Sequence, residues 1–150
     1  MRAFWSAVTC CLCLTVLWAC MRSPTPPVGR WEGTYEASDV MVAVRLEITP
    51  KGEIYLCAPD LMDIANSSGD ERPAMRQKLA QDLVIEWGAV EPRSLEFDGR
   101  VFRKPGGVAP QMEWNPQSRS MTAVLYLGMH AAIRVPMHTV TEFSTDPWSG

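Results

Sequence analysis

Apolar and polar residues alternate over several short stretches of the chain, the pattern expected for strands of a half-buried sheet. From Val42 to Ile48 every second residue is aliphatic, and small or polar residues stand between them. This period of two places the aliphatic side chains on one face of a strand. A Pro-Lys-Gly turn follows, and then a second apolar stretch at residues 53–57. Because Pro presets the turn and Gly accepts a positive φ, we predict a hairpin here.

A second hairpin is predicted over residues 95–102. Asp98-Gly99 is a strong two-residue turn signal between apolar stretches. With these two residues as the loop, Leu95 faces Phe102 across the strand pair. Further strands are predicted at residues 33–37, 83–87, 111–114, 121–127, 131–136 and 140–143.

One segment has the period of a helix. Residues 68–71, Ser-Gly-Asp-Glu, have the spacing of a capping box, and Pro73 suits a first helical turn. Met75, Leu79 and Leu83 then recur every four residues among polar side chains. The pattern predicts one amphipathic helix of about three turns.

The predicted fold is therefore mainly β, with this helix inserted mid-chain. About eight short strands joined by hairpins favour a small antiparallel barrel or a strongly curved sheet. Closure removes edges that would otherwise pair with other chains. Large inward residues such as Met41, Leu46, Phe97 and Met121 would fill the interior, but a barrel of this size is otherwise wide enough for one small ligand.

The first twenty residues differ in composition from the rest. Arg2 precedes an uncharged stretch that ends at Ala19, and Cys20 follows. A basic start, a short apolar core and a small final residue predict a signal peptide over residues 1–19. Leu17, Ala19 and Cys20 resemble the lipobox of bacterial lipoproteins, in which the cysteine is acylated. An ordinary signal peptide and an uncleaved single-span anchor remain alternatives.

The lipobox resemblance implies an exported protein, held on the periplasmic side of the bacterial cell envelope by acyl chains on Cys20. Residues 20–28 are rich in proline and are predicted to form an extended tether. The domain then covers residues 29–143, and residues 144–150 form a tail. If Cys20 carries lipid, Cys57 has no disulfide partner in the mature chain, so the domain depends on its core alone.

Residues 29–33, Gly-Arg-Trp-Glu-Gly, resemble the first strand of lipocalins and other calycin-type barrels. In those proteins the Trp closes the bottom of the barrel and often packs beneath an Arg from the last strands. Trp31 and Arg134 stand at the matching places in this chain. The resemblance implies a small barrel with an apolar interior and lipid-like ligands.

Composition excludes several classes of function. The 150 residues suit one domain, and a formal net charge of −3 argues against a nucleic-acid partner. The chain has no nucleophile elbow, Walker loop or dinucleotide motif, so we expect neither an enzyme nor a cofactor. His130 and His138 do not have the spacing of a metal motif, and no metal is expected.

The most distinctive surface segment is the loop after the second hairpin. Arg103 and Lys104 lead into a turn that contains Gly106 and Gly107. Two cations beside exposed backbone amides form a candidate ligand-binding site for an anion such as a phosphate or carboxylate. The alternative is a solvated loop in which the glycines only allow the turn.

Two functions stay open at this stage. The first is a structural or protein-interaction module with a solid β core, which contacts another envelope protein through exposed residues such as Trp87, Trp114 and Tyr126. The second is the binding of a small apolar or amphiphilic ligand inside the barrel, with the helix as a lid. An envelope enzyme is a third and less favoured class.

Overall fold

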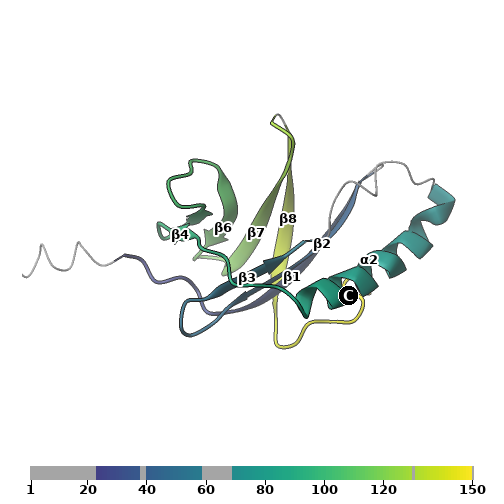
Figure 1. The fold of residues 1–150 in the computed structure, drawn as a ribbon, viewed down its shortest axis with the longest axis horizontal. Coiled ribbons are helices and arrows are strands. Elements are labelled where there is room, and N and C mark those ends of the chain that lie inside the picture. The colour runs from purple at the N-terminus through teal and green to yellow at the C-terminus, as the bar shows by residue number, and fades with distance from the viewer. Residues whose placement is uncertain (1–22, 38–39, 59–68, 130, 150) are drawn as a thin grey trace, which may run out of the picture.

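The computed structural model of the chain describes residues 23–37, 40–58, 69–129 and 131–149. This part contains eight strands in one antiparallel sheet and one α-helix, which confirms the mainly β fold (Figure 1). The elements in chain order are β1 (Gly29–Glu36), β2 (Met41–Ile48), β3 (Ile54–Cys57), the 3₁₀ turn η2 (Gly69–Glu71), α2 (Arg72–Trp87), β4 (Glu96–Phe97), β5 (Val101–Arg103), β6 (Pro110–Asn115), β7 (Ser120–Leu127) and β8 (Ala131–Val140).

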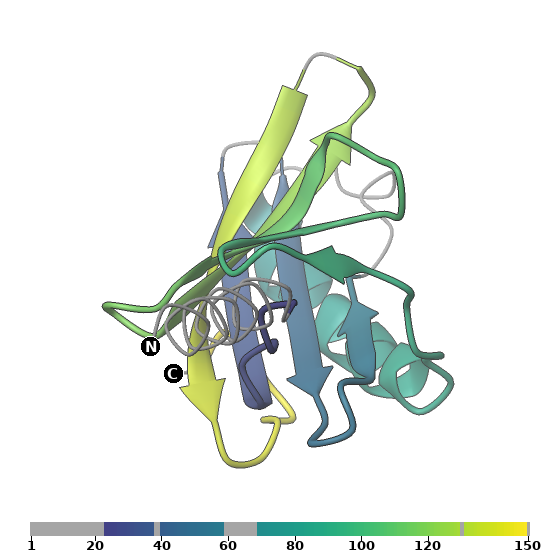
Figure 2. The same cartoon turned by 90° about the vertical axis from the view of Figure 1, so that its left-hand side faces the viewer.

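The sheet is curled into a half-barrel. Its strand order is β3-β2-β1-β8-β7-β6-β5-β4, so β3 and β4 are the two edges. The two edges approach one another through the segment that precedes β4. There the N–H of Arg93 donates to the Ile54 carbonyl of β3 (2.7 Å). The curl is visible from the side at which the chain enters the domain (Figure 2). We call the gap between β3 and the segment from Arg93 to β5 the seam.

The antiparallel topology gives the half-barrel two ends. We call the end at which β1 begins, next to the predicted tether, the proximal end. Because neighbouring strands alternate in direction, the turns β2–β3, β4–β5 and β6–β7 also lie at this end. The distal end holds the β5–β6 loop and the β7–β8 turn.

Side chains from seven of the strands fill the concave side of the sheet. Inward residues alternate with outward ones along β2 and β8, as a period of two requires. The buried set is Trp31, Val42, Val44, Leu46, Ile48, Ile54, Leu56, Phe102, Met112, Met121, Ala123, Ile133, Val135 and Met137. The half-barrel therefore has a packed apolar core.

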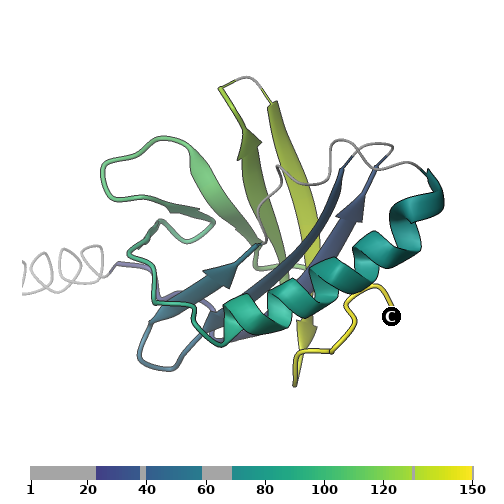
Figure 3. The ribbon, with the colours of Figure 1, turned by 45° about the vertical axis from the view of Figure 1, so that its right-hand side comes forward.

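A second apolar layer covers the outer face of β2. Helix α2 crosses this face (Figure 3), and Leu79 and Leu83 pack there against Met41 and Ala43. Trp148 contacts both groups, so the segment predicted as a tail packs against the domain. Because β2 is covered on both sides, its outward residues are apolar or paired rather than solvated.

A buried ion pair ties the C-terminal segment to this face. Arg45 Nε lies 3.0 Å from Glu32 Oε2, and both side chains are almost completely buried. The Ser144 hydroxyl donates to the other Glu32 oxygen (2.8 Å), and Arg45 donates a second hydrogen bond to the Ser144 carbonyl. The guanidinium of Arg45 also lies 5.2 Å from the centre of the Phe143 ring. These contacts compensate the cost of burying the two charges.

The prediction of a strand at residues 83–87 is wrong. These residues form the last part of α2, which is longer than the predicted three turns. Leu83 continues the helical spacing and is buried, whereas Val84 and Ile85 are exposed. The two exposed β-branched residues imitate a strand locally, but only the helical register buries Leu83. Of the predicted capping box, Ser68 lies outside the described residues, and Glu71 occupies the N-cap.

The second hairpin forms with a different register from the predicted one. Phe97, not Leu95, pairs with Phe102, and their rings stack with centres 4.3 Å apart. The loop is longer because Asp98 Oδ1 accepts hydrogen bonds from the amides of Arg100 (2.9 Å) and Val101 (2.8 Å). This side-chain turn replaces the tight two-residue turn that Asp-Gly predicts.

The predicted strand at residues 140–143 is also wrong as a separate element. β8 runs without a break to Val140, and residues 141 and 142 form a bend. Pro136 is compatible with the strand because β1 pairs with β8 only at residues 138–140.

Candidate functional site

Two of the four residues predicted to hold an anion, Arg103 and Gly107, have partners within the chain. Arg103, at the end of β5, pairs with Asp98 and donates to the Val108 carbonyl (3.3 Å). The hydrogen bond from Arg103, together with two backbone amides, lowers the pKa of Asp98 to about 2. The Gly107 amide donates to the Lys104 carbonyl (2.8 Å) and closes a turn. Arg103 and the Gly107 amide therefore already have partners within the chain.

Gly106 has a structural reason to be glycine. Its φ is +69°, a left-handed conformation that few other residues adopt without strain. Glycine at this position therefore allows the turn.

Lys104 lies instead at the mouth of a cleft along the seam. This cleft has a volume of about 380 Å³ and is open on one side. Leu56 of β3 and Leu95, just before β4, contribute apolar side chains, and Pro105 adds a third apolar surface. Arg93, Ser94 and Gln111 supply the remaining polar groups. The cleft volume is within the usual range for small-molecule sites.

Arg93 and Lys104 are the charged residues of the cleft, and both are cations. Neither has an ion-pair partner among the described residues, although most arginines of the domain do. Among the described residues that line the cleft, none carries a carboxylate. The cleft therefore combines apolar surface with two available positive charges.

The structure does not bring Trp31 and Arg134 together. Trp31 is buried on the concave side, with its ring edge toward Trp114 (6.0 Å between ring centres). Arg134 points outward from β8 and pairs with Glu113 on the outer face. The Trp–Arg contact implied by the lipocalin resemblance is thus absent between these two residues. Within the described chain the indole N–H of Trp31 has no hydrogen-bond partner.

Cys57 does not have the surroundings of a reactive thiol. Its burial, and then the nearby Glu86 carboxylate, raise its pKa from 9.0 to about 12. A nucleophilic cysteine needs a lowered pKa. Of the two histidines, His138 is exposed on β8 and His130 lies outside the described residues. In the part of the chain that the structure describes, no three metal-ligating side chains come together.

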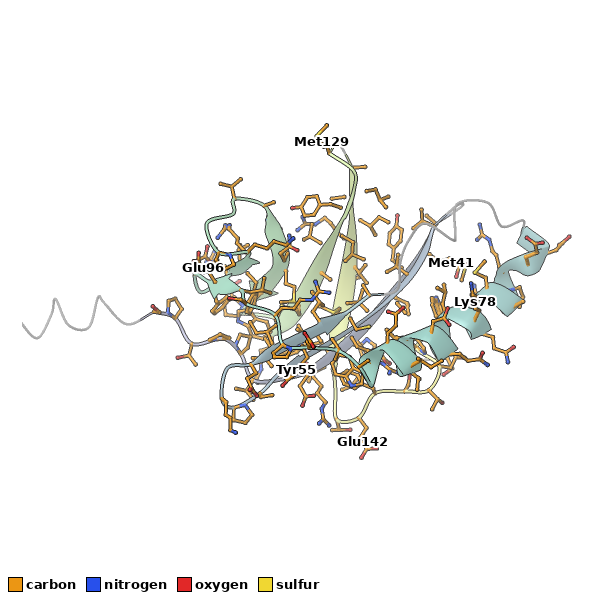
Figure 4. The ribbon with its side chains drawn as sticks, viewed as in Figure 1. Met41, Tyr55, Lys78, Glu96, Met129 and Glu142 are labelled. Atoms are coloured by element: carbon orange, nitrogen blue, oxygen red, sulfur yellow. The ribbon has the colours of Figure 1, made fainter. Side chains whose placement is uncertain are left out.

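The distal end carries a group of exposed apolar side chains, which we call the distal rim: Val108, Tyr126, Leu127 and Met129. Met129 lies at the tip of the β7–β8 turn (Figure 4). Met129 is 91% exposed, and Val108 in the β5–β6 loop is 90% exposed. The Tyr126 hydroxyl donates to the Pro110 carbonyl (2.9 Å) and so links the two segments. The sequence signal for such a rim is the presence of apolar residues in two loops. The apolar–polar alternation that predicts strands does not detect it.

The other two aromatic residues proposed as contacts lie differently. Trp87 is half-buried and packs on Phe143, with 4.6 Å between ring centres. Trp114 is half-buried against Trp31. Of the three candidates only Tyr126 belongs to an exposed surface.

No family model, no curated protein and no solved structure matches the chain.

The predicted signal peptide and Cys20 lie outside the described residues. Among the helices that the structure describes, none is long and apolar enough to cross a membrane. Pro24 of the tether packs near the β4–β5 turn, where a Cβ added to Gly99 would lie 3.5 Å from its ring. The entering chain thus passes close to the proximal end.

Proposed function

We propose that this chain is an exported envelope protein anchored by lipid on Cys20, and that it acts as a protein-interaction module with a solid β core. In this proposal the distal rim contacts another envelope protein. The exposure of Val108 and Met129 is the observation that carries it. Large apolar side chains are costly to expose to water, and exposed apolar groups often mark contact surfaces.

The position of the tether supports this orientation. Four peptide units separate Cys20 from Pro24 and span at most about 14 Å. If acyl chains hold Cys20 in a bilayer, the proximal end lies close to the membrane surface. The distal rim then points away from the membrane, where a protein partner can reach it.

The packed core favours an interaction module over a ligand inside the barrel. Phe102, Met112 and Met121 are completely buried on the concave side, where a barrel ligand would have to sit. A ligand there would have to displace these well-packed side chains. The core therefore supports a scaffold whose rigid sheet presents the rim.

The anchor is tested by Cys20→Ala. We expect this variant to leave the membrane fraction, whereas the parent protein stays there and carries acyl chains detectable by mass spectrometry. Membrane-bound and uncleaved Cys20→Ala protein would favour the single-span alternative.

The rim is tested by photo-crosslinking in intact cells. A photoreactive residue at position 129 should yield one discrete protein adduct. The same residue at position 85 is the matched control, since Ile85 is also well exposed (72%) but lies on α2. Val108→Ser should weaken the adduct from position 129. Equal adducts from both positions, or none from position 129, would argue against the rim as the contact surface.

A further inference from the structure

The seam is the place where the half-barrel fails to close. β3 and the segment before β4 meet through the hydrogen bond between Arg93 and Ile54. On the concave side of this contact the cleft of about 380 Å³ opens between β3, residues 93–95 and the chain that leaves β5. It is distinct from the distal rim, because it shares no residue with it.

The inner part of the cleft is apolar. Leu56 belongs to the buried core, and Leu95 packs against the same core from the other edge. Pro105 adds a third apolar residue to the lining. A short hydrocarbon group would replace water here with contacts to three apolar side chains.

The polar part of the cleft is positive. Arg103, next to Lys104 in the chain, is neutralised by Asp98, but Lys104 and Arg93 have no acidic partner among the described side chains. Ser94 and Gln111, two polar residues, also line the cleft. An anion could therefore pair with Lys104 and Arg93 without first breaking an ion pair within the chain.

We propose that the seam cleft binds a small organic carboxylate with a short apolar chain. The carboxylate lies between Lys104 and Arg93, since a guanidinium matches both carboxylate oxygens. The apolar chain lies against Leu56 and Leu95. This site goes beyond the proposed interaction role and leaves the distal rim free.

The test uses octanoate labelled with ¹³C at the carboxyl carbon and the full-length chain in lipid nanodiscs. We expect a saturable shift of the carboxyl resonance that empty nanodiscs do not give. Acetate lacks the apolar chain and octanol lacks the charge, so each should compete with the labelled octanoate at least about tenfold more weakly than unlabelled octanoate does. Octanol that binds as tightly as octanoate would overturn the proposal, as would the lack of saturable octanoate binding.

A pair of lysine variants locates the site. Lys104→Gln should weaken octanoate binding about tenfold, since one charge-assisted contact is lost. Lys51→Gln is the control, because Lys51 is also exposed and without an ion-pair partner in the described chain, but it lies in the β2–β3 turn at the proximal end. Equal losses of octanoate affinity in both variants would show that binding depends only on the overall charge of the protein. This result would refute octanoate binding in the seam cleft. Lys104→Gln should also leave the crosslink from position 129 unchanged, which separates this site from the rim.

Discussion

Gly33 is the residue that most directly limits how β1 meets β8. A Cβ at this position would lie 2.3 Å from the Pro136 carbonyl oxygen and 2.9 Å from the Met137 side chain. The carbonyl belongs to the backbone of β8, so it cannot rotate away. The contact explains why glycine occupies the middle of a buried strand, where it is otherwise unfavourable.

We therefore expect Gly33→Ala to destabilise the domain by about 1–3 kcal/mol through overpacking. The measurement is urea unfolding followed by tryptophan fluorescence. Gly88→Ala is the control, because Gly88 has helical angles and its nearest contact would be 3.4 Å away. A Gly33→Ala variant as stable as Gly88→Ala would show that β1 and β8 separate easily.

Cys57 gives a prediction about alkaline pH. Its folded pKa of about 12 lies above the ordinary value of 9.0, because burial and Glu86 disfavour the thiolate. The unfolded chain therefore loses this proton first. Its contribution to stability is complete below pH 9 and is lost as the pH rises from 9 to 12.

Cys57→Ala should accordingly remove part of the alkaline loss of stability, measured as the slope of the unfolding free energy above pH 9. In the parent protein, iodoacetamide should modify Cys57 only under unfolding conditions, as read by peptide mass spectrometry. Rapid modification of the folded protein would contradict the burial of this thiol.

At the scale of elements, α2 is stabilised by the side chains it buries against the sheet more than by the helix propensity of its residues. Leu83 is completely buried against Ala43 and Cys57, while Ile85, two residues later, is 72% exposed. We expect Leu83→Ala to cost about 2–5 kcal/mol, the usual range for a buried leucine. Ile85→Ala should change the unfolding free energy by less than about 0.5 kcal/mol.

Chemical denaturation of these two variants checks the helical register. If residues 83–87 formed a strand, Leu83 and Ile85 would share one face and their substitutions would have similar costs. A difference between them is therefore specific to the helix.

The sequence predicted the elements whose signals are local. The first hairpin followed from alternation and a Pro-Lys-Gly turn, and the structure confirms it, with Ile48 paired to Ile54. The second hairpin was placed correctly, but its register depended on the hydrogen bonds of Asp98, which composition does not reveal. The end of α2 was missed because exposed Val84 and Ile85 imitate a strand.

At the scale of the whole molecule, the candidate sites depend on contacts between distant segments. The sequence pointed to Lys104 as a candidate anion-binding residue but not to Arg93. Arg93 lines the cleft only because β3 meets the segment before β4, which the sequence does not show. Likewise, the role of Trp148 became visible only when the C-terminal segment was seen against β2 and α2. Patterns along the chain do not show which sheet edges meet, so the seam could not be predicted.

The last prediction concerns how the whole domain stands on a membrane. It depends on the proposed lipid on Cys20 and on the short tether that holds Pro24 near the proximal end. A fluorophore on Lys51→Cys reports the proximal end, and one on Met129→Cys reports the distal rim. In vesicles that contain lipids with headgroup nitroxides, we expect strong quenching at position 51 and little at position 129, since such quenching requires close approach.

Cys57 is buried, so it should not compete for the label in the folded protein. Adding Cys20→Ala to each labelled variant is the control and should abolish quenching at both positions. Equal quenching at 51 and 129 would mean that the domain lies on its side or tumbles freely on the tether. Stronger quenching at position 129 would show that the distal rim faces the lipid. Its exposed apolar side chains would then contact the membrane rather than a protein partner.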